Sequence, residues 1–175
     1  MRKMPIKSEM IRKPRPTQEQ YDLLSQQEAD RLLAMEKERA EDVVYPFPIG
    51  GKQIVIPLVS CDKTHNFLFD INSSRLQISK HTFQTRTHGV IPLIRLDINS
   101  RPHINPDQTD AGRTHLHRYR SGSGLDWAVA LPETFGNPND IFGLLHRFMD
   151  ECRIIGKPKI ELLSVPRTLF DHVND

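Results

Sequence analysis

The sequence predicts an α+β protein: an antiparallel sheet of about six strands flanked by an N-terminal and a C-terminal helix. Two observations carry this prediction. Short β-branched or alternating runs follow one another between residues 53 and 131 with short connections, which favours antiparallel pairing. Apolar residues at helical spacing occur on both sides of this region, over residues 26–40 and after residue 137.

We predict three regions along the 175 residues: a disordered basic arm at 1–16, a single α+β domain at 17–165 and a tail at 166–175. The arm has six basic side chains against one acidic side chain, with three prolines and no periodicity. Such a composition disfavours a packed structure, but a basic arm can add contacts to phosphates.

The N-terminal helix is predicted over residues 26–40. Ser25 and Glu28 match a capping box, and an apolar stripe that includes Leu32 follows them. We expect the charged side of this helix to face solvent. Pro46 and the glycines after it then open the sheet region.

The predicted strands share β-branched or alternating residues, and they cover residues 53–59, 66–71, 75–79, 82–87, 91–98, 113–120 and 127–131. Pro57 removes a backbone donor, so the strand predicted over residues 53–59 is expected to be an edge strand or to end at Pro57. Residues 72–74 read as a three-residue hairpin loop between the second and third strands.

The C-terminal helix is predicted to begin at Asn137–Pro138, which resembles an N-cap followed by proline in the first turn. Apolar residues from Ile141 to Cys152 then form one continuous face, and Gly156 ends the helix. Residues 160–165 are predicted to add a last strand.

Charge is concentrated in the middle of the chain. Residues 75–120 contain eight arginines and lysines and five of the eight histidines, against three acids. This asymmetry indicates an anionic partner, most often nucleic acid, although a solvated basic face gives the same pattern. No apolar run is long enough for a membrane helix. Cys61 and Cys152 are expected to be reduced thiols in a cytoplasmic protein.

The candidate site lies on the strand predicted over residues 113–120. On an ideal strand Arg113, His115, His117 and Tyr119 share one face, and Leu116 points into the core. We expect this face to be open to solvent. One histidine would then act as general base, and the other histidine or Tyr119 as general acid, in RNA cleavage without a metal. Arg113, Arg118 or Arg120 would stabilise the phosphorane charge, and of these only Arg113 shares the histidine face on an ideal strand.

A binding surface without catalysis is a second interpretation. Arginines contact phosphates and aromatic rings stack on bases, so we assign binding roles to His103, Asp107, Arg118 and Arg120. Asp107 can equally cap a bend. Trp127 is expected in the core, because a single large aromatic residue in an apolar strand is usually buried.

A metal site is a third interpretation of the two histidines. A His-x-His pair on a strand can supply two ligands, which His103 together with Asp97, Asp107 or Asp110 could complete. No carboxylate follows the pair at the spacing expected of a cupin strand, so we assign no metal and no cofactor. In the simplest interpretation the two imidazoles only bind backbone groups in a polar sheet.

The order PHxNPD, then HLHxYR, then a glycine-spaced turn and Trp-Ala resembles a family of small uncharacterised bacterial proteins. The resemblance covers about residues 25–155 and implies a short N-terminal helix, a β-rich middle and a C-terminal helix. It implies no activity. The chain departs from the family pattern at Ser121, where an acidic residue is usual, and its GSG turn lacks an aromatic residue.

These observations lead us to expect a nucleic-acid binding protein with RNA as the preferred partner, and the histidine pair adds the hypothesis of a metal-independent endoribonuclease of the toxin or phage-defence type. The alternative is a non-catalytic protein-binding module, such as an inhibitor or antitoxin-like partner in a phage–host conflict system. We expect no membrane association.

Overall fold

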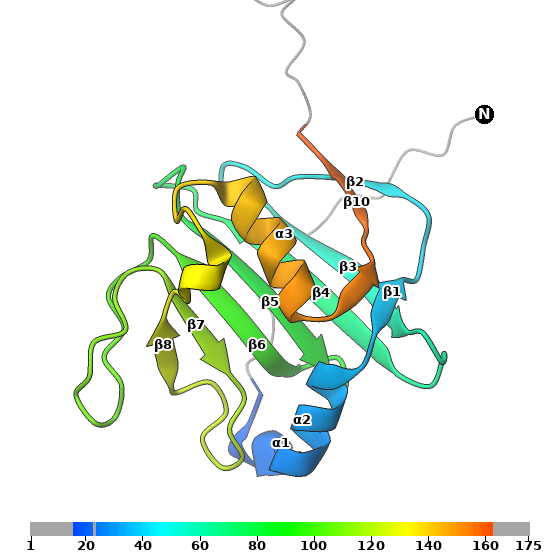
Figure 1. Cartoon of the computed structure of the whole chain (residues 1–175), viewed down its shortest axis with the longest axis horizontal. Coiled ribbons are helices and arrows are strands. Elements are labelled where there is room, and N and C mark those ends of the chain that lie inside the picture. Colours follow the sequence, from blue (N-terminus) through cyan, green and yellow to red (C-terminus); the bar gives the residue numbers. More distant parts are fainter. Residues whose placement is uncertain (1–15, 23, 163–175) are drawn as a thin grey trace, which may run out of the picture.

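The computed structural model describes residues 16–22 and 24–162 (Figure 1). Three α-helices and a short 3-10 helix occur in this part of the chain: α1 (Gln18–Asp22), α2 (Gln26–Ala34), η1 (Glu133–Phe135) and α3 (Ile141–Glu151). The strands are β1 (Lys37–Arg39), β2 (Val44–Pro46), β3 (Gln53–Ser60), β4 (Asn66–Ser73), β5 (His81–Thr87), β6 (Ile91–Ile98), β7 (His115–Arg118), β8 (Ala128–Ala130), β9 (Ile154–Gly156) and β10 (Lys159–Glu161).

The described residues form an eight-stranded sheet in the order β8-β7-β6-β5-β4-β3-β1-β9. Strands β3 to β8 follow one another as an antiparallel meander, β1 is antiparallel to β3, and β9 is parallel to β1. A separate parallel pair joins β2 to β10. The α+β class and the mostly antiparallel sheet are therefore confirmed, although the sheet has eight strands rather than about six.

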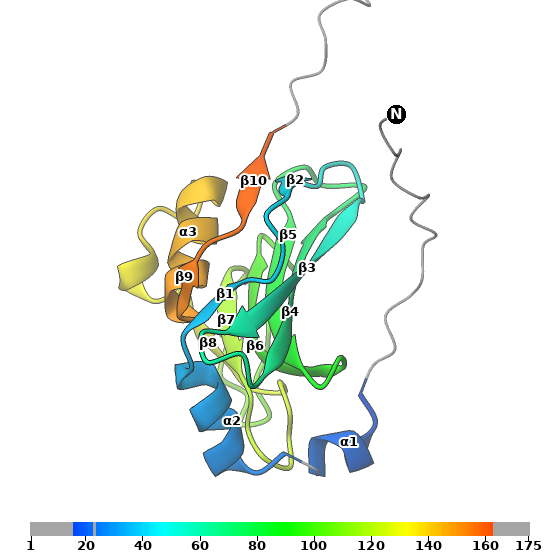
Figure 2. The ribbon, with the colours of Figure 1, turned by 90° about the vertical axis from the view of Figure 1, so that its right-hand side faces the viewer.

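One face of the sheet carries the hydrophobic core, and α2 and α3 lie on that side (Figure 2). The apolar face of α3 is buried against it, and the Phe148 ring lies 5.8 Å from the ring of Phe69 and 5.9 Å from that of Phe83. Leu96 and Leu116 pair across β6 and β7 within the same core. Successive side chains of a strand point to opposite faces, so the neighbours of Leu96 and Leu116 along β6 and β7 lie on the face away from the core.

The opposite face carries ion pairs on strands β4 to β6. Arg86 of β5 forms an ion pair with the buried carboxylate of Asp70 on β4, with 2.8 Å between Nε and Oδ2. On β6, Arg95 lies opposite Gln84 and Asp97 lies opposite Thr82, and the Arg95 and Asp97 side chains form a second ion pair. Two ion pairs therefore lie on this face of strands β4 to β6, next to β7.

The N-terminal helix is shorter than the prediction of 26–40. Ser25 caps it as expected, but Met35 is extended and β1 follows, because this segment pairs with β3. Lys37 is fully buried, so the expectation of a solvent-exposed charged side is wrong at this position. Local helical spacing could not reveal the strand, which depends on a partner far away in sequence.

The strand predicted over residues 75–79 is wrong. These residues form the loop between β4 and β5, where Leu76 and Ile78 are 96% and 92% exposed. The C-terminal helix begins at Ile141 rather than at Asn137, since Asp140 is the residue whose side chain accepts the Gly143 amide hydrogen.

The predicted arm, except for residue 16, and the predicted tail lie outside the described residues. Cys61 is exposed and Cys152 is buried, and both thiols are free. Within the described part of the chain, no helix combines the length and apolarity that crossing a membrane requires.

Candidate functional site

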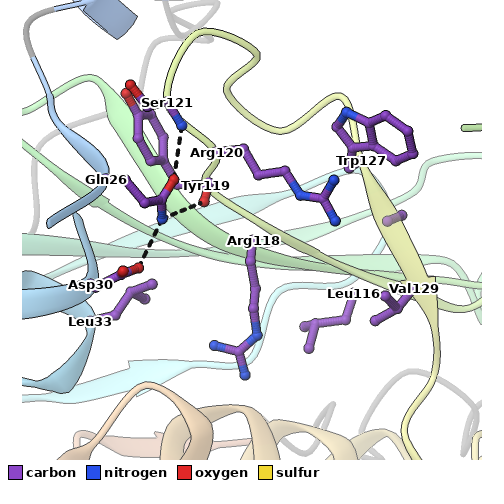
Figure 3. Close-up of a pocket in the computed structure, with 11 residues that line it drawn as sticks. Gln26, Asp30, Leu33, Leu116, Arg118, Tyr119, Arg120, Ser121, Trp127 and Val129 are labelled. Atoms are coloured by element: carbon purple, nitrogen blue, oxygen red, sulfur yellow. Dashed lines mark hydrogen bonds between the residues drawn. The ribbon is translucent and has the colours of Figure 1, made fainter. Parts of the chain in front are cut away.

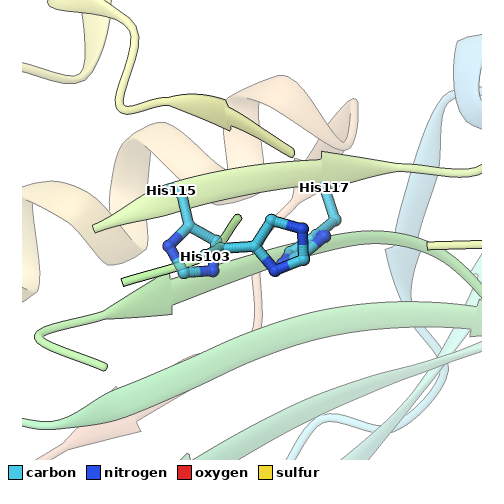
Figure 4. Close-up of side chains that lie close together, drawn as sticks. All are labelled: His103, His115 and His117. Carbon is cyan, nitrogen blue, oxygen red and sulfur yellow. The ribbon is translucent and has the colours of Figure 1, made fainter. Parts of the chain in front are cut away.

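Strand β7 is the centre of the candidate site, because candidate site residues lie on both of its faces. It covers residues 115–118, half of the predicted strand. In the register with β6, Asp97 is opposite His115 and Arg95 is opposite His117. Directly opposed residues of neighbouring strands lie on the same face, so these four side chains share one face of the sheet. Figure 4 shows the two histidines on the side that points away from α3.

Three histidines meet on this face. His115 and His117 come from β7, and His103 reaches over them from the loop between β6 and β7. The ring centroids are 4.9 Å apart for His115 and His117, 5.2 Å for His103 and His115, and 4.7 Å for His103 and His117. One ring nitrogen of each lies within 4.8 Å of the other two.

Each imidazole also contacts a backbone carbonyl oxygen. His115 Nδ1 lies 2.8 Å from Gly112 O, and His103 Nε2 lies 3.0 Å from Asp126 O. His117 Nδ1 lies 2.7 Å from Leu125 O and 3.1 Å from the carbonyl oxygen of residue 127. A carbonyl oxygen can only accept, so each of these nitrogens carries the donated hydrogen.

Asp97 of β6 contacts both histidines of β7. Its Oδ2 lies 3.5 Å from His115 Nε2 and 3.3 Å from His117 Nε2, and Thr82 donates to Oδ1. Burial raises the pKa of the Asp97 carboxyl, but the two imidazoles and the charge of Arg95 outweigh it and hold the pKa well below its usual range. Burial lowers the pKa of the His117 imidazole. The carboxylate is therefore ionised beside His117, which prefers to be neutral.

The prediction of a solvent-open histidine face is wrong. His115 and His117 do share one face, but they are only 2% and 0% exposed, and the ring of His103 packs against both of them (Figure 4). A general base for RNA cleavage must reach the 2′-hydroxyl. These buried imidazoles do not meet that condition, and their replacement should cost substantial stability because it leaves buried carbonyl groups without donors.

Arg113 and Tyr119 do not join the histidines. Arg113 is exposed and lies outside β7, and Arg95 is the arginine that contacts the cluster, with 3.0 Å between its Nη2 and His117 Nε2. Tyr119 is buried beyond the end of the strand, where its hydroxyl lies 2.6 Å from the carbonyl oxygens of Tyr21 and Leu24. It anchors the N-terminal helices and is not placed to act as an acid.

The loop between β6 and β7 is held by its own turn. The exposed Asp107 accepts hydrogen bonds from the backbone and side chain of Thr109, so it caps the bend. Asn105 is buried and bonds to both backbone groups of Ala128. Asp110 accepts from the Gly112 amide and lies outside the histidine cluster.

The other face of β7 borders a groove of about 480 Å³ (Figure 3). Its walls come from α2, from β7 and β8, and from the loop between these two strands. Gln26 of α2 holds this loop, since its side chain accepts from the Ser121 amide and donates to Asp30 and to the carbonyl oxygen of Tyr119.

Arg118, Arg120 and Trp127 give the groove its chemical character. The Arg120 guanidinium carbon lies 4.6 Å from the centroid of the Trp127 ring. Arg118 is paired with Glu151 of α3, and 47% of its side chain remains exposed. Trp127 was expected in the core, but it is only partly buried and lines the groove, because the loop carries it past the edge of the core.

Sequence reasoning missed three residues of these sites: Arg95, Asn105 and Gln26. Arg95 alternates with Leu96 in the sequence, so its outward direction could have been read, but its position opposite His117 depends on the strand register. Asn105 and Gln26 act through tertiary hydrogen bonds that no local pattern announces.

A comparison with known protein families matches residues 24–154 to a family of unknown function (DUF6978). The match spans most of the 175-residue chain. The chain belongs to this family. It contains the core, the histidine cluster and the groove within the matched range. No curated protein and no solved structure matches the chain.

Proposed function

We propose that this member of the DUF6978 family binds single-stranded RNA in the groove between α2 and strands β7 and β8. The observation that carries the proposal is the Arg120 guanidinium over the half-buried Trp127 ring, beside the exposed side chain of Arg118. Guanidinium groups pair with phosphates, and aromatic rings stack on unpaired bases. Arg118 and Arg120 are two of the four residues to which the sequence assigned binding roles; the other two, His103 and Asp107, do not line the groove.

The apolar wall of the groove fits a base better than a free anion. Leu33, Leu116 and Val129 line it beside the two arginines. A nucleotide inserted there would place its base against apolar side chains and Trp127, and its phosphate near the guanidinium groups. The proposal includes no cleavage step, because the imidazoles expected to provide it are buried on the other face of β7.

Binding of a short single-stranded RNA, followed by fluorescence anisotropy over a range of salt concentrations, tests this proposal. Each phosphate contact to a single strand contributes about −0.7 to the slope of log K against log salt, so Arg118→Gln with Arg120→Gln should make the slope shallower by roughly 1.4. Arg75→Gln is the control, since it removes one exposed charge far from the groove.

Glu151 provides a test in the opposite direction. Its carboxylate neutralises Arg118, so Glu151→Gln should release that guanidinium and strengthen RNA binding. Equal affinities for the wild type, the double arginine variant and Glu151→Gln would contradict the proposal. The alternative, a protein-binding module, predicts no RNA affinity and a protein that co-purifies with the wild type but not with the arginine variant.

A further inference from the structure

In the neutral tautomers that the carbonyl contacts favour, the second nitrogen of each ring carries a lone pair. In His115 and His117 this nitrogen faces Asp97 Oδ2, and in His117 it also contacts the Arg95 guanidinium. A neutral imidazole has a single N–H, and in each ring that hydrogen is donated to a backbone carbonyl. The remaining nitrogens are Nδ1 of His103 and Nε2 of His115 and His117. Metal-binding histidines show the same arrangement, in which one nitrogen donates to the protein and the other is free to coordinate.

The spacing around Asp97 matches a tetrahedral site. Zinc bonds of about 2.1 Å place neighbouring ligand atoms about 3.4 Å apart in a tetrahedron. Asp97 Oδ2 lies 3.5 Å from His115 Nε2 and 3.3 Å from His117 Nε2. The group of side chains whose ligand atoms lie within 4.8 Å of one another contains the three histidines but not Asp97. Coordination by all four side chains therefore requires His103, which lies on a loop, to move toward His115, His117 and Asp97 by roughly 1.4 Å or more.

We propose that His103, His115, His117 and Asp97 bind one divalent transition-metal ion of the zinc class. Imidazole and carboxylate ligands suit this class of ion, and a set of four protein ligands is typical of a structural site rather than a catalytic one. The ion fastens the loop between β6 and β7 to the sheet. Because His103 also donates to Asp126, the ion fixes the loop that leads to Trp127.

The Arg95 guanidinium contacts two of the proposed ligand atoms and would compete with a bound ion for them. Its guanidinium donates to Asp97 Oδ2 at 2.9 Å and contacts His117 Nε2 at 3.0 Å, so it supplies one positive charge to the cluster. Its side chain is 31% exposed and can swing toward solvent when an ion enters. Arg95→Ala should therefore bind the ion more tightly than the wild type.

Titration of chelator-treated full-length protein with Zn²⁺, followed by calorimetry, tests the site. We expect one ion per chain and a higher melting temperature with the ion bound. His103→Ala should weaken binding at least about 100-fold, since it removes a ligand rather than an outer-shell partner. His146→Ala is the matched control, because this histidine is exposed on α3, and it should bind as the wild type does.

The melting temperatures of the ion-free proteins show whether His103→Ala folds. X-ray absorption of the Zn²⁺-loaded wild type gives an answer that needs no variant, and three imidazole nitrogens with one carboxylate oxygen are expected. A shell dominated by water, an affinity unaffected by His103→Ala in a folded variant, or no binding would overturn the proposal. The metal site faces away from the groove. A wild-type protein that binds Zn²⁺ at this site but does not bind RNA would therefore contradict only the proposed function.

Discussion

Lys37 is a charged residue that the fold buries completely. Its ammonium group donates to the carbonyl oxygens of Leu33, Met35 and Cys152 at 3.1, 2.7 and 3.0 Å, and it lies 4.8 Å from the centroid of the Phe67 ring. Burial lowers the pKa of Lys37 from 10.5 to about 8. The three carbonyl groups offset part of the cost of burying the charge.

The unfolding free energy should rise with pH above about 8 because of Lys37. Below that pH the amine is charged in the folded and the unfolded chain, and folding carries the full cost of its burial. Between the two pKa values the folded chain loses a proton that the unfolded chain retains, so stability increases, by up to about 3 kcal/mol.

Urea denaturation of the wild type and of Lys37→Met, from about pH 7 to pH 10, measures this contribution, since the variant lacks the titrating group. As pH rises, the unfolding free energy of the wild type should increase relative to that of Lys37→Met. The Cys152 thiol, whose pKa burial raises to about 12, stays protonated over this range. A difference that does not vary with pH would show that the Lys37 amine does not titrate there.

At the scale of elements, the edge strand β8 depends on one side chain from another loop. It pairs with β7 on one side, and on the other side Asn105 accepts from the Ala128 amide at 2.8 Å and donates to the Ala128 carbonyl at 2.9 Å. An asparagine thus takes the place of a neighbouring strand at this position.

Asn105→Ala should destabilise the protein by about 2 kcal/mol, because both backbone groups of Ala128 lose their partner in a buried environment. Faster hydrogen exchange should be confined mainly to β8 and the loop before it. The exposed Asn139→Ala serves as control and should change stability little. Unchanged exchange in β8 would mean that pairing with β7 alone holds the strand.

The elements that the sequence predicted correctly are those with a strong local period. The alternation of residues 66–71 and the apolar face of α3 both follow directly from burial on one side. Strands β1 and β9 have three residues each and pair only with distant segments, so no period could identify them. A local period can also mislead: the alternation of Leu76 and Ile78 predicted a strand, but both residues are exposed in a loop.

For the whole molecule, the sequence could place His115 and His117 together on one face but not decide what covers that face. Strand alternation gives the shared direction. The covering depends on the path of the loop that carries His103, which is set by the turn at Asp107 and the contacts of Asn105. The same tertiary arrangement moves Trp127 from the expected core to the wall of a groove. Strand β7 therefore separates a buried histidine cluster from an arginine- and tryptophan-lined groove.

Trp127 is the single tryptophan of the chain, so its fluorescence reports on the groove without any label. Titration of the full-length protein with single-stranded RNA is the most direct test of the proposed function. We predict a saturable change in emission that weakens with added salt and is lost in the Arg118→Gln, Arg120→Gln double variant. Emission that stays constant at every RNA concentration, at low salt, would contradict binding in this groove.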